Sequence, residues 1–247
     1  MWCAQTYLRN VNNGAEVYVI GTAHISKRSA EEVTDIIQRV RPATVVVELC
    51  AARARKLMTD ALPADIATTV AELLRTLGAP GDLTTKLLAL GLRGFYAMWR
   101  HAGLEPGGEF KAALKEASAI SAKVVYGDQE AELTMKKLAA SIKLTDVLRG
   151  LTTPPPPELA KVMTPGISVE EAIERLKTRE TVRAMAAYTR KMHPAASRVL
   201  LDERDIILAD ALYKQEGTVV GVVGLAHLDG IEERFRQLNA APQLLTT

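Results

Sequence analysis

The sequence predicts an α/β protein with a small, mainly parallel sheet surrounded by many helices. Three short valine-rich runs, at residues 17–21, 45–48 and 219–224, end in glycine or glutamate. They are too short for buried helices and are typical of inner parallel strands. Long stretches of helical periodicity separate them. With 247 residues, of which 48% are hydrophobic and 24% charged, the chain can bury a substantial core.

In chain order, strands are expected at residues 2–8, 16–20, 43–49, 123–126 and 218–223. The turn signal Asn12-Asn13-Gly14 joins the first two as a hairpin. We expect the second strand to stop at Gly21, after which Ser29 caps a helix that runs to about Val40. The third strand then completes a βαβ unit, whose crossover should be right-handed.

A large helical insertion is expected between the third and fourth strands, over residues 51–121. After the fourth strand, helical segments continue to about residue 214 with a break at His193-Pro194, and a last helix follows from about Gly230. Residues 152–157 form a stiff proline-rich connector, because consecutive prolines donate no hydrogen bonds. We expect a single domain over residues 1–247.

Charge and composition exclude several classes of protein. Thirty-one basic and twenty-nine acidic residues leave a net charge of +2, which gives no electrostatic reason to expect a nucleic-acid partner. The two cysteines make no disulfide framework. No apolar stretch reaches the roughly 18–20 residues that a membrane-spanning helix needs, and the N-terminus does not read as a signal peptide. These features predict a soluble chain.

Three of the predicted strands end in residues that can carry chemistry. The motif Gly-x-x-His occurs twice, from Gly21 to His24 and from Gly224 to His227, each time after an apolar strand, and Glu48 follows three valines. We expect each glycine to let the backbone turn sharply, so that the histidine points back over the strand end. Ligands of open α/β sheets bind at the carboxyl ends of strands. His24, Glu48 and His227 are therefore expected to share one pocket.

Two imidazoles and a carboxylate can act in two ways. They can bind a divalent metal such as zinc, manganese or cobalt, with an open position for water. Without metal, the same groups can serve as a general acid and base. Glu48 favours a site, because burying a carboxylate after three valines is costly unless it is paired or ligated. The alternative is that each histidine caps or packs under a helix.

Five further charged residues are secondary candidates. Arg204 could polarise a carbonyl or hold a carboxylate, with Glu203 and Asp205 beside it. Consecutive helix positions do not share a face, so at most one or two of these three point inward. Glu109 falls at a helix start, where the helix dipole alone favours a carboxylate. Asp128 follows a strand and either caps the next helix or faces the site.

These motifs resemble the TraB/PrgY family over nearly the whole chain. The similar segments are Gly-Thr-Ala-His-Ile-Ser at 21–26, Val-Val-Val-Glu-Leu-Cys at 45–50, Glu-Pro-Gly-Gly-Glu-Phe at 105–110, Glu-Arg-Asp at 203–205 and Gly-Leu-Ala-His-Leu-Asp-Gly-Ile at 224–231. The resemblance places the chain in a wider superfamily with the Tiki, erythromycin esterase-like and ChaN-like proteins. One departure is Gln129 after Gly127-Asp128, where arginine is expected.

The resemblance implies a metal-dependent hydrolase, expected to be a peptidase, with His24, Glu48 and His227 as metal and catalytic groups. Arg204 is a further catalytic candidate from its own chemistry. It also allows a non-catalytic binding or tethering module, in signalling of the pheromone-shutdown kind or at an organelle membrane. The expected location is the cytoplasm or the cytosolic face of such a membrane, with any membrane anchor outside these residues. Apolar stripes on helices such as Leu83–Met98 suggest a homodimer.

Overall fold

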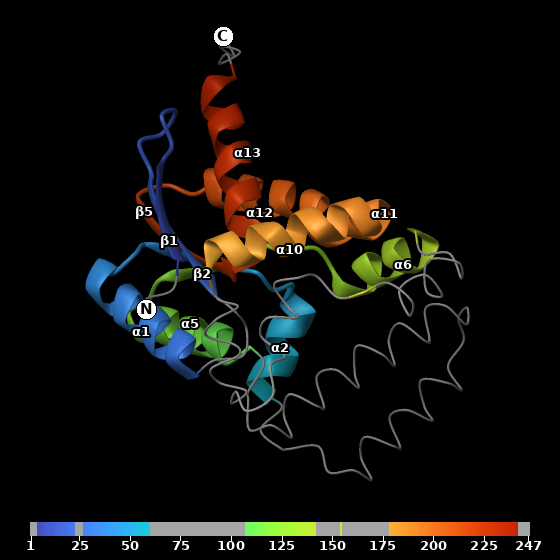
Figure 1. The fold of residues 1–247 in the computed structure, drawn as a ribbon. Coiled ribbons are helices and arrows are strands. Elements are labelled where there is room, and N and C mark those ends of the chain that lie inside the picture. The colour runs from blue at the N-terminus through green and yellow to red at the C-terminus, as the bar shows by residue number, and fades with distance from the viewer. Residues whose placement is uncertain (1–3, 23–26, 60–106, 142–153, 155–177, 242–247) are drawn as a thin grey trace.

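The computed structural model describes residues 4–22, 27–59, 107–141, 154 and 178–241 (Figure 1). Five strands form one sheet in the order β1-β2-β5-β3-β4. Strand β1 (Ala4–Arg9) pairs antiparallel with β2 (Glu16–Thr22), as the hairpin prediction required. Strands β2, β5 (Thr218–Gly224), β3 (Thr44–Val47) and β4 (Lys123–Tyr126) run parallel to one another. The predicted α/β class and mainly parallel sheet are confirmed.

The last strand in the sequence lies at the centre of the sheet. Helix α1 (Lys27–Val40) connects β2 to β3, but these two strands are not neighbours, because β5 lies between them. Gly221 of β5 is in register with Val19 on one side and with Val46 on the other. The carboxyl ends of β2, β5 and β3 are therefore adjacent.

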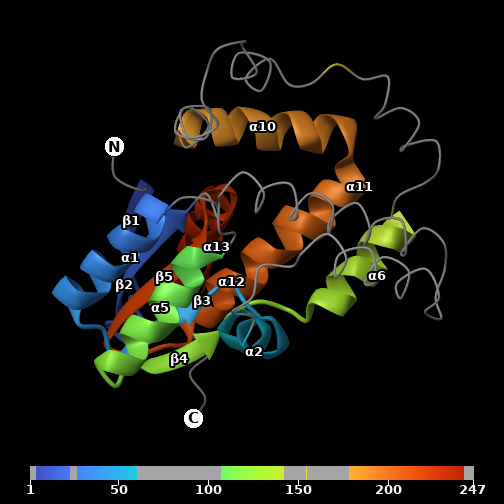
Figure 2. The same cartoon turned by 90° about the horizontal axis from the view of Figure 1, so that it is seen from below.

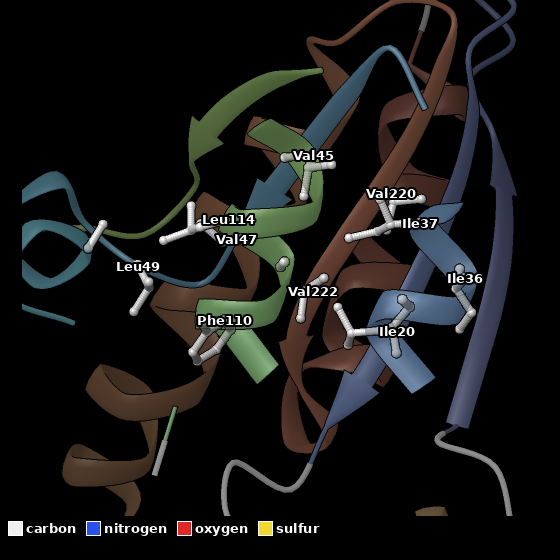
Figure 3. Close-up of a cluster of buried hydrophobic side chains, with 14 residues drawn as sticks. Ile20, Ile36, Ile37, Val45, Val47, Leu49, Phe110, Leu114, Val220 and Val222 are labelled. Atoms are coloured by element: carbon white, nitrogen blue, oxygen red, sulfur yellow. The ribbon is translucent and has the colours of Figure 1, made fainter. Parts of the chain in front are cut away.

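Helices cover both faces of the sheet, and the strand side chains alternate between them. Helices α1 and α5 (Gly108–Ala119) cover one face, where Val45 and Val47 point into a core with Phe110 (Figure 3). Helices α12 (Glu203–Tyr213) and α13 (Leu228–Ala240) cover the other face, where Val46 packs (Figure 2). Burial on both faces explains why these strands read as continuous valine runs.

The remaining described helices are α2 (Ala51–Thr59), α6 (Ala131–Ser141), α10 (Arg179–Met192) and α11 (Pro194–Ser197). Helix α10 ends at Met192 and α11 begins at Pro194, which confirms the predicted break at His193-Pro194. The expected insertion is helical at its two described ends, α2 and α5. Residues 83–98, where a dimer interface was predicted, and the connector at 152–157 apart from Pro154 lie outside the described residues. No helix in the described ranges is both long enough and apolar enough to cross a bilayer.

Three predicted element boundaries were wrong. Helix α1 begins at Lys27, so Ser29 lies inside it, fully buried, and does not cap it. Strand β2 continues past Gly21 to Thr22, because Thr22 still pairs with Gly224 of β5. Helix α13 begins at Leu228, since the short 3-10 turn η2 (Leu225–His227) leads directly into it.

Candidate functional site

Glu48 lies directly after β3, at the carboxyl ends of the parallel strands. The residue is only 4% exposed. The backbone N–H of Gly224, at the end of β5, donates a hydrogen bond of 2.6 Å to Oε2 of Glu48. The backbone N–H of Glu48 in turn donates to the carbonyl of Val222 at 3.1 Å. The sheet thus places this carboxylate against the start of the second Gly-x-x-His motif.

His227 completes that motif and lies beside Glu48. Its Nε2 atom is 3.3 Å from Oε1 of Glu48, and its Nδ1 atom is 2.6 Å from Oδ1 of Asp205. The imidazole and both carboxylates are buried. The ring is therefore held between a carboxylate from the sheet and another from helix α12.

Arg204 lies on the other side of Glu48. Its Nη2 atom contacts Oε1 of Glu48 and donates to Oδ2 of Asp128 at 2.8 Å, while its Nε donates to Oδ1 of Asp128 at 3.1 Å. The pairing with Asp128 is the two-bond arrangement that a planar guanidinium makes with a carboxylate. Arg53 of α2 adds a longer contact of 3.4 Å to Asp128. A continuous polar cluster results, which we call the strand-end cluster: Arg53, Asp128, Arg204, Glu48, His227 and Asp205.

A π-helical turn, η1 (Arg198–Asp202), directly precedes α12 and the residues that enter the cluster. Turns of this kind occur frequently at functional sites. Arg204 and Asp205 both point inward, whereas Glu203 points away and bonds Nζ of Lys137 on α6 at 2.7 Å. The structure therefore agrees with the expectation that at most two of these three residues face the sheet.

Burial and charge together shift the ionisation of the cluster. Burial disfavours the charged imidazolium of His227, but the Glu48 carboxylate and the hydrogen bonds to Asp205 and Glu48 outweigh it and raise the pKa of His227 to about 9. Burial likewise opposes the charge of Arg204, yet Glu48 and Asp128 hold the pKa of Arg204 above its ordinary value. Burial also raises the pKa of Asp205, against the opposing effect of His227.

The two motif glycines differ in what they do. The chain turns directly after Gly224, as predicted, because β5 ends there and the 3-10 turn η2 follows. It does not turn at Gly21, since β2 continues to Thr22. Neither glycine has a positive φ. Gly21 is closely packed: a Cβ there would lie 2.6 Å from Cδ1 of Leu228 and 2.9 Å from Cδ1 of Leu225, so these side chains would have to shift.

The other predicted residues fall in different places. Asp128 does not cap α6, which begins at Ala131; its Oδ1 accepts from the backbone N–H of Gln129 at 2.8 Å and its carboxylate binds the arginines. Glu109 is in the first turn of α5, as predicted, and it is fully buried. It lies on the helix layer that covers the face opposite α12. His24 is in the segment 23–26, outside the described residues.

Two residues of this region were missed as site candidates. Arg53 follows the third strand closely and belongs to the segment that resembles the family, but it was not weighed as a site residue. Gly230 lies inside α13, where a Cβ would come 1.9 Å from Oδ2 of Asp205. From the sequence, this helix was expected to start at about Gly230, where a glycine is no signal, so only the observed start of α13 at Leu228 draws attention to this position.

The fit of a metal ion can be tested on the donor atoms themselves. Within the described residues, no three His, Cys, Asp or Glu side chains are placed to hold one ion together. Two donors are suitably spaced, since Nε2 of His227 and Oε1 of Glu48 are 3.3 Å apart. Bonds of about 2.0–2.1 Å place neighbouring ligands of a tetrahedral ion roughly 3.3 Å apart. Nε2 of His227 and Oε1 of Glu48 therefore fit as two of the three ligands of an ion. For the ion to bind, Arg204 must give up its contact with Glu48.

Fold and cluster together define a class: an α/β protein with a buried polar centre at the carboxyl ends of its parallel strands. The TraB/PrgY/gumN family model matches residues 8–242, and the chain belongs to this family.

Similar proteins come from animals and archaea. TraB domain-containing proteins of human and mouse are 29% and 30% identical over 248 and 251 residues, and each alignment covers 90% of this chain and 63% of the relative. An uncharacterised protein of Methanocaldococcus jannaschii is 26% identical over 231 residues, which cover 92% of this chain and 55% of the relative. The chain thus spans less than two thirds of the length of these relatives.

Proposed function

We propose that this protein is a metal-dependent hydrolase whose divalent ion is held by Glu48, His227 and His24. The observation that carries the proposal is the 3.3 Å spacing between Oε1 of Glu48 and Nε2 of His227, two donors buried at the edge of the sheet where α/β proteins bind ligands. A second support is Asp205 on Nδ1 of His227, because metal-ligating histidines almost always donate their other N–H to such a partner.

His24 is proposed as the third ligand from its place in the chain. It follows β2 by two residues, and β2 pairs directly with β5, whose end leads to His227. The two Gly-x-x-His motifs therefore leave neighbouring parallel strands in the same direction. A His-Glu-His set with an open position for water is an arrangement that catalytic zinc uses.

The residues of the strand-end cluster then have distinct roles. When bound, a divalent ion lowers the pKa of a water molecule and polarises a carbonyl oxygen. Glu48 would either ligate the ion or, as a base that does not ligate it, accept the proton of the attacking water. Arg204 is held in place by Asp128 and points its Nη2 at Glu48, so it can stabilise negative charge that develops on a substrate oxygen. Burial of the cluster strengthens each of these electrostatic effects.

We propose a peptide as the substrate, and this part rests on the resemblance to the Tiki proteins, whose paired Gly-x-x-His motifs and glutamate serve in proteolysis. We place the protein in the cytoplasm or at the cytosolic face of an organelle membrane on the same ground.

A second candidate function is a binding or tethering module without turnover. The observation that favours it is the balance of charge in the cluster. Three carboxylates, of Glu48, Asp128 and Asp205, are paired within the chain with two arginines and with His227. Such a balanced network can stabilise a scaffold without performing chemistry.

A peptide-cleavage experiment separates these functions. A defined peptide pool is incubated with wild type, Glu48→Gln and the control Asp210→Asn, each with added Zn²⁺ or Mn²⁺ and again with chelator, and products are read by mass spectrometry. Asp210 is on α12 but pairs with Arg234, away from the cluster. We expect cleavage by wild type and by the control, and its loss in Glu48→Gln and with chelator.

The other outcomes contradict the proposal in different ways. Cleavage that survives chelator but is lost in His227→Gln would mean a metal-independent hydrolase with a histidine base. Absence of cleavage in wild type under every metal condition would favour the binding module.

A further inference from the structure

We propose that Asp205 is a positioning residue that fixes the imidazole of His227 so that Nε2, and not Nδ1, faces Glu48. The proposal adds to the function proposed above, and it depends on that function only in assigning Nε2 as a metal ligand. The contact itself is direct: Nδ1 of His227 and Oδ1 of Asp205 are 2.6 Å apart, and the two side chains are 4% and 7% exposed. An ionised carboxylate only accepts hydrogen bonds, so the hydrogen between them is on Nδ1.

Helix α12 provides both the residue that contacts His227 and the residue that contacts Glu48. Asp205 and its neighbour Arg204 are consecutive residues, and they reach the imidazole and the Glu48 carboxylate respectively. One rigid helical turn thus sets the positions of both groups that face each other at 3.3 Å. A displacement of either group by a fraction of an ångström would change the spacing on which ligand binding depends.

A second, independent observation is the glycine that borders the Asp205 carboxylate. Gly230 lies inside α13, three residues after His227, and a Cβ there would be 1.9 Å from Oδ2 and 2.3 Å from Cγ of Asp205. Glycine is normally unfavourable relative to alanine inside a helix. Gly230 thus stands in the first turn of α13 at a position where any side chain would meet this carboxylate.

The test reads the ring nitrogens of His227 directly, without substrate or metal. Protein with ¹⁵N-labelled histidine is studied by long-range ¹H–¹⁵N NMR, and His227→Gln assigns the signals among the four histidines. At a pH above about 9, where the ring of His227 is neutral, we expect its one proton to be on Nδ1 in wild type. In Asp205→Asn we expect Nδ1 to become an unprotonated acceptor, because the amide NH₂ can donate to it. The control Asp210→Asn makes the same chemical change on the same helix and should leave the His227 signals unchanged.

Gly230→Ala tests the same idea without removing the carboxylate. We expect it to shift the His227 nitrogen signals although Asp205 is intact, since the new Cβ displaces that side chain. Unchanged His227 signals in both Asp205→Asn and Gly230→Ala, in folded protein, would overturn the proposal.

Metal binding provides the second readout. We expect Asp205→Asn to weaken Zn²⁺ or Mn²⁺ binding roughly 10–100-fold, as other losses of such partners do, and Asp210→Asn to leave it unchanged. Metal binding that is equal in wild type and in Asp205→Asn would also overturn the positioning role. A wild type that binds neither metal but shows the expected NMR changes would instead overturn the proposed function and leave the positioning of the ring intact.

Discussion

The guanidinium of Arg204 binds the carboxylate of Asp128 through two hydrogen bonds, of 3.1 Å from Nε to Oδ1 and of 2.8 Å from Nη2 to Oδ2. This pair joins α12, on one face of the sheet, to the residue that follows Gly127 at the end of β4. The same Nη2 contacts Glu48 after β3. Three segments that are far apart in sequence therefore converge on one arginine, which holds two buried carboxylates in place.

Removal of this arginine should destabilise the fold strongly. In Arg204→Met, Glu48 and Asp128 lose the cation that both contact, and breaking a buried ion pair in this way typically costs about 3–5 kcal/mol. The free energy of unfolding in urea measures the loss. The control is Arg234→Met on α13, whose partner Asp210 is 33% exposed and which should cost less than about 1 kcal/mol. Equal losses in the two variants would show that Arg204 does not have this central role.

Gly21→Ala should destabilise the protein through overpacking. The new methyl group would meet Leu228 and Leu225 at less than 3 Å, and such insertions cost about 1–3 kcal/mol. The partner variant is Leu228→Ala, which makes room for the methyl group. In that background we expect the cost of Gly21→Ala to fall to a fraction of its value in wild type. An equal cost in both backgrounds would point to the strand backbone at Gly21 and not to packing against α13.

Much of the fold could be predicted from periodicity. The valine runs predicted β3 and β5 nearly to the residue, because strands buried on both faces have no polar positions. The insertion of β5 between β2 and β3 was not predictable in this way, since strand order depends on long-range pairing that no local pattern records. The start of α1 was missed because Ser29 looks like a cap, and its burial against the sheet depends on tertiary packing.

The cluster was predicted in outline and not in its connections. Glu48 and His227 were expected together from their places at strand ends, and Arg204 as a residue that could point toward them. The contact between Asp205 and Nδ1 of His227 could not be predicted in this way. It depends on the rotation of α12 about its axis, and a π-helical turn directly precedes this helix. Glu203, two residues before Asp205, was weighed in the same way as Asp205, but its side chain contacts Lys137. The role of His24 stays a prediction.

The stability of metal-free protein should fall as the pH rises from about 6.5 to about 9. The pKa of His227 is about 9 in the folded protein and about 6.5 when unfolded. The stabilisation from its charge is therefore complete below about pH 6.5 and is lost as the pH passes through 9, a change of up to about 3 kcal/mol. Urea unfolding at a series of pH values, with chelator present, measures it. If the free energy of unfolding of His227→Gln falls with pH as steeply as that of wild type, other groups cause the loss of stability.

Metal content tests the central claim most directly. Freshly purified protein, and protein reloaded with Zn²⁺, Mn²⁺ or Co²⁺ after chelator treatment, is measured by elemental analysis beside His24→Gln, Glu48→Gln, His227→Gln and the control His193→Gln at the end of α10. We expect about one ion per chain in wild type and in the control, and at least a tenfold weaker affinity in the other three variants. Wild-type protein that holds no ion under any of these conditions would contradict it.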